Sequence, residues 1–313
     1  MSSTFQNPTA ATKFLQTMRV LDSMNASSAD LDKGIKLLGY TCSLLTVFLS
    51  PLGRDTMSSP TSLTKGLFSM HNNISIARYA LRIVNGMPSS IKAAVDGSWE
   101  YGDLDDYEHL LDEEKRSDGS ATKKNITASP VASLAEKSLP YSMLGYYPLE
   151  ALAYFGWMAP GMLYDEKPPT CHINASPLTK LWTYIRDKEN HANTNLVSAA
   201  SCCFWLWYII ADIIVQSDRV KRLTAAINEL ESSSNDSKEK DEMLVNLNEQ
   251  LTDSKIMLTR ECFFLLPGVH WSLPNWDKKP LLPRWLLTSL MFGEAVTGFA
   301  HSYMKKDRAM LGK

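Results

Sequence analysis

The sequence predicts an all-α membrane protein, with amphipathic N-terminal helices, one or more apolar spans and a polar helical pair. The first observation is that no Asp, Glu, Lys or Arg occurs from Asn190 through Ala211, and the apolar run continues to Val215. About 20 such residues form a helix long enough to cross a hydrocarbon core of roughly 30 Å. The second observation is that two N-terminal segments are apolar except for narrow polar stripes at helical spacing. The third observation is that leucines recur at heptad-like positions in a polar segment near residue 250.

Composition limits what kind of membrane protein this can be. The chain has 313 residues, 44% of them hydrophobic, a net charge of -2 and a mean hydropathy of -0.18. A transporter made mostly of spans would be more apolar, so much of this chain must be amphipathic or lie outside the lipid. The charge balance gives no reason to expect a nucleic-acid partner.

Residues 1–96 form the predicted amphipathic region. Residues 11–24 have the spacing of a short helix, 32–50 of a longer one and 62–95 of a third. We expect these helices to lie on a bilayer surface, although the pattern fits a bundle helix with a solvated edge equally well, and one helix can play both roles in turn. The expected headgroup contacts are Lys33, Lys36, Arg78 and Arg82, and the expected membrane-inserting face is Ile35, Leu37, Leu38, Leu44, Leu45, Ile74, Ala77, Leu81 and Val84.

Two regions of different character follow. Residues 97–139 are acidic and then rich in Ser, Thr and Lys, which predicts an exposed flexible loop. Acids surround His109 there, but exposed charge runs are usually only solvated, so we expect no metal site. Residues 140–216 are predicted to be apolar helices that include the main span, with Pro148 and Pro160 bending or breaking the first of them.

The C-terminal half divides into a polar and an apolar part. Residues 217–258 predict an antiparallel helix pair outside the membrane, with a break from Ser232 to Lys240. Residues 259–313 predict a C-terminal membrane helix, with 281–303 as a second anchor, and a basic tail that favours the cytosolic side.

No pattern typical of catalysis occurs. The sequence lacks GxxxxGK[ST], GxGxxG, HExxH, GxSxG and CxxC, and its six histidines are isolated from one another. Five scattered cysteines include an adjacent pair that matches neither a redox motif nor a zinc knuckle. We therefore predict that the protein is not an enzyme and has no catalytic residue, cofactor or metal.

Two separated blocks carry a family resemblance. The N-terminal block reads Asp32-Lys33-xx-Lys36-xx-Gly39-Tyr40 and then Ser75-xx-Arg78-xx-Leu81-Arg82. The C-terminal block runs from Arg260 to the passage Leu266, Pro267, Gly268, Val269, His270 and Trp271. Together they cover about half of the chain and resemble the peroxin-11 family, closest to its gamma type. The segments at 97–138 and 217–258 look longer than is usual in the family, and Glu294 stands where the family has small residues or Ser.

The resemblance implies a peroxisomal membrane protein, with both termini cytosolic, that remodels and elongates the membrane for peroxisome division. Amphipathic helix insertion and self-association would do this, and the implied partners are the phospholipid membrane, further copies of the chain and the fission machinery. The alternative function is a solute pore or transporter of the organelle membrane, also proposed for this family, which would need Glu150, Asp212, Glu294 and His301 to face one aqueous path. A third hypothesis is a soluble helical scaffold that binds partners through residues 217–258.

Overall fold

The computed structural model describes residues 10–26, 28–49, 62–96, 128–159, 176, 179, 194–232 and 238–310. Most of the predicted acidic loop, residues 97–127, lies outside these ranges. So do residues 160–164 of the predicted kinked segment, residues 190–193 of the predicted span and Lys313 of the basic tail.

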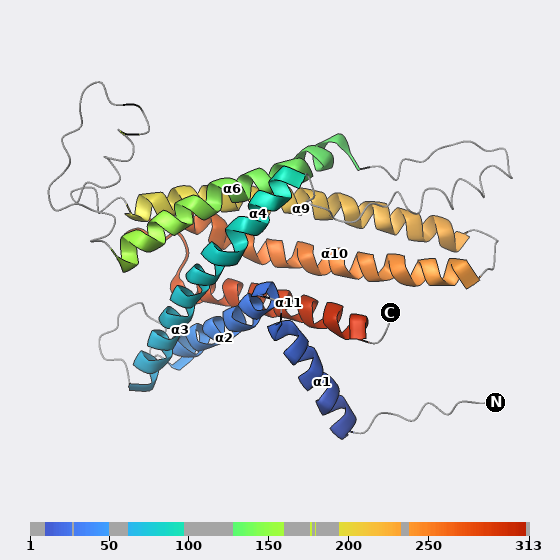
Figure 1. The fold of residues 1–313 in the computed structure, drawn as a ribbon, viewed down its shortest axis with the longest axis horizontal. Helices are drawn as coiled ribbons and strands as arrows, with labels where there is room; N and C mark the ends of the chain where they lie inside the picture. Colours follow the sequence, from blue (N-terminus) through green and yellow to red (C-terminus); the bar gives the residue numbers. More distant parts are fainter. Residues whose placement is uncertain are drawn as a thin grey trace.

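Every regular element in the described ranges is a helix, so the all-α prediction is confirmed for that part of the chain. Figure 1 shows the arrangement. The elements are α1 (Ala10–Asn25), α2 (Ser28–Leu49), α3 (Ser62–Leu81), the π-helical η1 (Arg82–Gly86), α4 (Met87–Asp96), α6 (Pro130–Met158), α9 (Thr194–Ser232), α10 (Lys238–Trp271) and α11 (Arg284–Met310).

The helices pack into a closed ring. Going round it, α2 contacts α11, α11 contacts α10, α10 contacts α9, and α9 contacts α6. The ring closes because α3 packs on α2 at one end and leads through η1 into α4, which packs on α6. In Figure 1, α9 and α10 run side by side along the long axis, while α3 and α4 cross obliquely and α1 projects from the body.

The long third helix predicted over 62–95 is present, but it contains a π-helical turn. Five residues, Arg82–Gly86, have this geometry at the point where the helix reaches α6. π-helical turns are rare and are often found at functional sites. Gly86 allows the close approach there, because a Cβ at this position would lie 2.7 Å from the ring of Tyr147.

The observed start of α6 shows that the predicted acidic loop ends earlier than expected. It begins at Pro130 rather than near 140, because the Ser129 side chain accepts a hydrogen bond from the backbone N–H of Ala132 (3.2 Å) and Pro130 occupies the first turn. Pro140 and Pro148 both lie inside the helix, which runs on to Met158.

The predicted antiparallel pair is confirmed as a packed pair, but not as a separate unit. The C-terminal half of α9 lies against the N-terminal half of α10, and the break between them matches the predicted one. The boundaries expected at 216/217 and 258/259 fall inside these two continuous helices, so the pair is an extension of them. Its core consists of Leu223, Ala226, Ile227, Leu230, Met243, Leu247 and Leu251.

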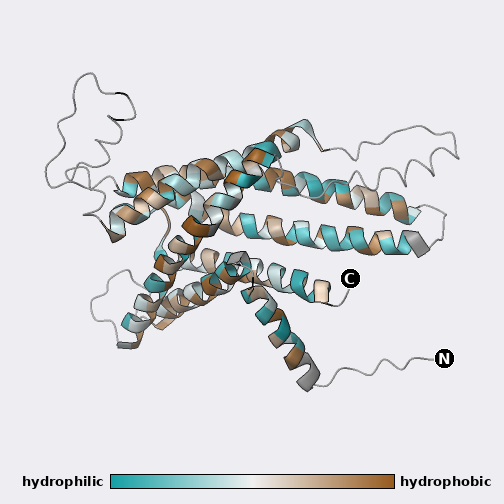
Figure 2. Ribbon diagram, in the orientation of Figure 1, coloured by the Kyte–Doolittle hydropathy of each residue, from teal (hydrophilic) through white to brown (hydrophobic). Residues whose placement is uncertain are grey.

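One helix in the described ranges, α9, is long and apolar enough to cross a membrane. Only 33% of its most apolar window is buried inside the protein. The second predicted anchor, 281–303, forms most of α11, a helix that does not reach the same apolarity. In Figure 2 the ribbons of α3 and α4 mix hydrophobic and hydrophilic residues, while the far ends of α9 and α10 are largely hydrophilic.

Helices α2, α3 and α4 bury several polar side chains and expose several large apolar ones, although Lys65, Asn72, Asn73 and Lys92 are exposed on α3 and α4 as well. On α2, Lys36, Ser43 and Thr46 are buried, whereas Leu45 and Phe48 are exposed. The same holds further along the ring, where Thr64, Arg78 and Ser90 are buried while Leu63, Val84, Ile91 and Val95 are exposed. The polar stripes read from the sequence therefore face the inside of the ring.

Candidate functional site

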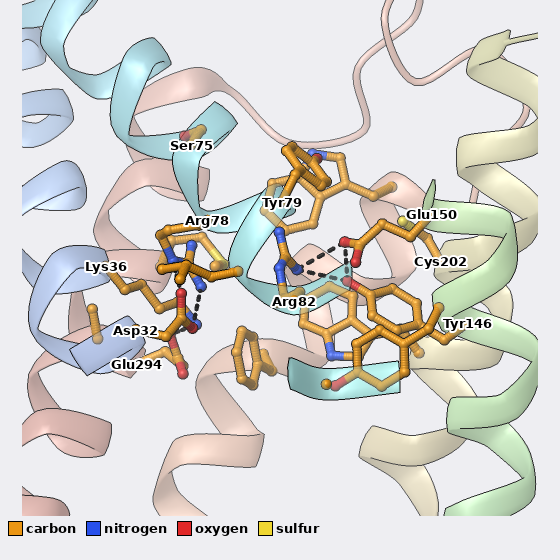
Figure 3. A pocket seen from close by; sticks show the side chains of 18 of the residues that line it. Asp32, Lys36, Ser75, Arg78, Tyr79, Arg82, Tyr146, Glu150, Cys202 and Glu294 are labelled. Atoms are coloured by element: carbon orange, nitrogen blue, oxygen red, sulfur yellow. Dashed lines mark hydrogen bonds and ion pairs between the residues drawn. The ribbon is translucent and has the colours of Figure 1, made fainter. Parts of the chain in front are cut away.

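A cavity of about 570 Å³, lined by both charged and aromatic side chains, lies inside the ring (Figure 3). It is bounded by α2, α3, η1, α4, α6, α9, α10 and α11, so helices from both ends of the chain build it. Aromatic rings form much of its wall, among them Tyr79, Tyr146, Trp205, Trp271 and Trp276. Its charged lining residues are Asp32, Lys33, Lys36, Arg78, Arg82, Glu150, Arg260 and Glu294.

The first charged cluster joins α2, α10 and α11 around one carboxylate. Glu294, whose side chain is 1% exposed, forms an ion pair with Lys36 and accepts a hydrogen bond from Arg260 Nε at 2.9 Å. Both cations also flank the ring of Phe264, with Lys36 Nζ 4.2 Å and Arg260 Cζ 5.3 Å from its centroid. Two cations therefore meet at Glu294, and Arg260 Nη1 also lies 3.7 Å from Oε1 of the buried Glu261.

The second cluster joins α2 to α3. Arg78 donates from Nε and Nη2 to the two oxygens of Asp32, at 2.7 and 3.0 Å, in the two-pronged geometry that suits a guanidinium and a carboxylate. Burial raises the pKa of Asp32, but the hydrogen bonds and charge of Arg78 outweigh it and hold that pKa below its ordinary value. The two N-terminal passages, Asp32 to Tyr40 and Ser75 to Arg82, thus contact each other directly.

The third cluster joins η1 to α6. Arg82 Nη1 lies 2.8 Å from Glu150 Oε1 and donates to the Tyr146 hydroxyl at 2.7 Å, and that hydroxyl in turn donates to Glu150. The guanidinium also lies over the ring of Tyr79, 4.7 Å from its centroid. Figure 3 shows this cluster and the Asp32–Arg78 pair facing each other across the cavity.

All four predicted headgroup cations lie in or beside the cavity rather than on an outward surface. Lys36 and Arg78 are only 7% and 8% exposed, and Arg82 is half-buried. Lys33 is half-buried and lies 3.2 Å from Asp30. The structure corrects the expected direction of these side chains, because Lys36, Arg78 and Arg82 each pair with an acid on another helix, while Lys33 pairs with Asp30 of its own helix. Contact with headgroups stays a prediction for a state in which the ring opens.

The predicted membrane-inserting residues differ in their exposure. None of the nine is fully buried, but Leu81 lines the cavity and Ile74 faces Gly39 of α2. Leu38, Leu45, Ala77 and Val84 are exposed, and Ile35, Leu37, Leu44, Ile74 and Leu81 are half-buried.

The C-terminal passage of the resemblance forms the end of α10 and holds the turn to α11. His270 is buried and its Nδ1 accepts a hydrogen bond from the backbone N–H of Leu282 at 3.1 Å. Trp271 stacks on Trp205 of α9 with ring centroids 5.9 Å apart. Pro267 is fully buried, while Leu266 is exposed. The passage therefore fixes how three helices meet.

Of the four residues expected to line a solute path, two line the cavity and two lie elsewhere. Glu150 and Glu294 line the cavity, but Asp212 and His301 do not. Asp212 is buried and accepts a hydrogen bond from Gln216 at 3.2 Å, and His301 lies 3.5 Å from Asp253.

Sequence reasoning missed the third cluster and the role of Arg260. A sequence signal did exist for one pair, since Tyr146 and Glu150 are four residues apart and therefore share a helix face. Within the described ranges no three His, Cys, Asp or Glu side chains are grouped to hold a metal ion.

Comparisons with known proteins give no matching family model, no matching curated protein and no matching solved structure.

Proposed function

We propose that this chain is an integral membrane protein of the peroxisome that remodels and elongates the membrane for division. The observation that carries the membrane part is the inverted distribution of side chains on α2, α3 and α4. Phe48 on α2 and Leu63 on α3 are 73% and 60% exposed, while the charged Lys36 and Arg78 on the same two helices are buried. Water-soluble proteins favour the opposite arrangement, and large exposed apolar surfaces mark contacts with lipid or another protein.

The character of α9 supports anchoring in the membrane. Its apolar window is mostly outside the protein core, whereas the core helix of a soluble bundle would be mostly covered. Trp207 and Ile210, near the middle of the apolar part, are exposed. Lipid is the medium in which such a surface costs least.

Remodelling would follow from the outward apolar face of α2, α3 and α4. An amphipathic helix that inserts roughly 5–10 Å into one leaflet expands that leaflet and favours positive curvature. Many self-associated copies would stretch an organelle into a tubule ready for the fission machinery. The proposed location in the peroxisome and the proposed role in its division rest on the family resemblance of the two sequence blocks. The N-terminal block lies in these helices.

The proposal is tested by making the outward face polar. Full-length protein reconstituted in phospholipid vesicles should form tubules visible by electron microscopy. Phe48→Ser combined with Val84→Ser should reduce tubule number severalfold, because both side chains are strongly exposed on the proposed inserting face. A matched control is Val245→Ser, which removes a similarly exposed side chain (58%) from the polar part of α10.

Equal loss of tubules in the control, or no loss in the double variant, would contradict insertion by these helices. The localisation is tested separately by imaging tagged protein in cells, where we expect peroxisomal rings that elongate on overexpression. Staining of another organelle would overturn the peroxisomal assignment.

A second candidate function, a solute pathway, is favoured by the cavity alone. A charge-lined space inside a ring of helices is what a transported solute requires. Glu150 and Glu294 would face such a path, whereas Asp212 and His301 lie outside it. Solute flux through reconstituted protein that falls in Glu150→Gln and persists in Asp212→Leu would favour this function.

A further inference from the structure

The cavity has more cationic than acidic side chains in its wall. Five basic residues and three acidic residues line it. Burial lowers the pKa of Lys36 to about 7, although the Glu294 charge opposes this, and the excess remains when Lys36 is counted as neutral. The basic residues are Lys33, Lys36, Arg78, Arg82 and Arg260, and the acids are Asp32, Glu150 and Glu294.

The wall of the cavity is also richer in hydrogen-bond donors than in acceptors. Both oxygens of Asp32 accept from Arg78, and Glu294 lies between Lys36 and Arg260. Each guanidinium has five N–H donors, so a single carboxylate partner uses only part of this capacity. The wall is therefore rich in donors whose complement is a ligand rich in acceptors.

Two buried donors in the wall have no hydrogen-bond partner among the described residues. They are Arg82 Nε and Trp276 Nε1. Two buried acceptors of the wall, Glu150 Oε2 and Glu294 Oε2, also accept no hydrogen bond among the described residues, although Glu294 Oε2 forms an ion pair with Lys36. Unsatisfied buried polar atoms each cost about 1–3 kcal/mol, so a bound group that accepts from both donors would be stabilised. The same group would be repelled by the Glu150 charge.

We propose that the cavity binds a small organic oxyanion, a carboxylate or phosphate attached to an apolar body. The oxyanion would lie at Arg82, the cation with the unpartnered N–H, with Arg78 and Arg260 contributing further positive charge. The apolar body would pack among Tyr79, Trp157 and Trp205, which line the same space. The volume lies within the range of small-molecule sites, roughly 300–1,000 Å³. This binding stands apart from membrane remodelling and from solute flux, and it can hold if either fails.

The test is calorimetric titration of the purified full-length protein in nonionic detergent, at fixed ionic strength. The probes are phenyl phosphate and benzoate, and phenol is the matched neutral body. We expect both anions to bind, with phenol at least about tenfold weaker because it lacks the charge that strengthens hydrogen bonds to arginine. Binding of neither anion, or binding of phenol as tightly as the anions, would overturn the proposal.

Two variants should move the affinity in opposite directions, which a merely structural role would not do. Arg82→Gln should weaken phenyl phosphate binding about tenfold or more, because it removes a charged donor. Glu150→Gln should tighten it severalfold, because it removes the neighbouring negative charge while keeping a hydrogen-bonding group beside Arg82. Arg222→Gln is the control, since this cation pairs with Asp218 on the polar part of α9 and does not line the cavity.

An affinity that is unchanged in Arg82→Gln, or weakened in Glu150→Gln, would contradict the assignment of the site. Should Arg82→Gln fail to fold, judged by its helical circular dichroism, the direction of the Glu150→Gln effect decides. The natural source of the oxyanion is separated by competition. Displacement of phenyl phosphate by phosphatidate in lipid nanodiscs, but not by phosphatidylcholine, assigns the site to a lipid headgroup, and displacement by inorganic phosphate alone assigns it to a soluble anion.

Discussion

At the scale of single residues, one acid holds a large part of the ring together. Glu294 lies on α11, yet its partners come from α2 and α10, at opposite ends of the sequence. Taking charges out of water is expensive, so a buried carboxylate is retained only where its partners are fixed around it. The sequence shows Glu294 as a lone acid in an apolar helix and as a departure from the resemblance. The structure shows it as the counter-ion of Lys36 and Arg260.

Removing Glu294 should therefore destabilise the protein strongly. Glu294→Leu leaves the buried Lys36 without its carboxylate and leaves Arg260 with Glu261 alone, and breaking a buried pair this way costs about 3–5 kcal/mol. The double variant Glu294→Leu with Lys36→Met removes one of those cations and should recover part of the loss. The measurement is the midpoint of thermal unfolding in detergent, followed by circular dichroism.

The control for this experiment is Glu249→Leu, which removes an acid that is 35% exposed on the polar part of α10. Its effect should be within about 0.5 kcal/mol, as is usual for surface substitutions. A loss for Glu294→Leu no larger than the control's would show that the pair contributes little.

At the scale of helices, the sequence predicted most of the elements but not how they pair. Apolar periodicity was enough to locate α1, α2, the long third helix, α9 and the polar pair, because that periodicity is a local property. The start of α6 was placed too late, since the Ser129 cap and Pro130 lie in a segment whose average composition is that of a loop. The ring was not predictable, because Asp32–Arg78 and Arg82–Glu150 join residues 46 and 68 positions apart.

Close helix contacts depend on residues whose role is likewise visible only in three dimensions. A Cβ on Gly145 would lie 2.4 Å from the ring of Phe204, so this glycine is what allows α6 to approach α9. One buried serine supports the same contact, as Ser201 Oγ donates to the carbonyl of Tyr146 at 3.2 Å.

The contact between α10 and α11 should weaken in acid. Asp253 accepts two hydrogen bonds from Arg308, at 2.6 and 2.8 Å, and lies 3.5 Å from His301. Burial raises the pKa of Asp253, but the neighbouring His301 and the hydrogen bonds and charge of Arg308 outweigh it, so the folded pKa is below the ordinary 3.8. A lowered carboxyl pKa stabilises the folded state above pH 3.8, and this stabilisation is lost as the pH falls through the folded pKa.

We therefore expect the unfolding temperature of the wild type to fall between pH 5 and pH 3 by more than that of Asp253→Asn, measured in the same detergent. The difference isolates this carboxyl from all others in the chain. Parallel curves for the two proteins would show that the contact does not depend on the charge of Asp253.

At the scale of the whole molecule, the cations would have two roles in two states of the ring. They form ion pairs in the closed ring, and they would contact lipid headgroups in an open one. In the closed ring Arg78 and Arg82 are held by Asp32 and Glu150, and large apolar side chains such as Phe48 and Leu63 are exposed on the outside. If α3 separates from α2 and α6, both arginines become available to anionic headgroups and the inserted area grows. Because the ion pairs oppose this opening, weakening them should promote membrane remodelling.

Asp32→Asn combined with Glu150→Gln should accordingly increase tubule formation in vesicles that contain anionic lipid, by severalfold at equal protein density. Charge reversal at Arg78→Glu and Arg82→Glu should abolish the anionic-lipid dependence, because no cation is then released. Asp218→Asn is the matched control, as it breaks the Asp218–Arg222 pair outside the ring. Electron microscopy of reconstituted vesicles gives the tubule count, and hydrogen exchange over Ser62–Asp96 shows whether α3 has left its partners. Unchanged tubules together with faster exchange would mean that the ring opens without bending the membrane, and the headgroup role of the two arginines would then be wrong.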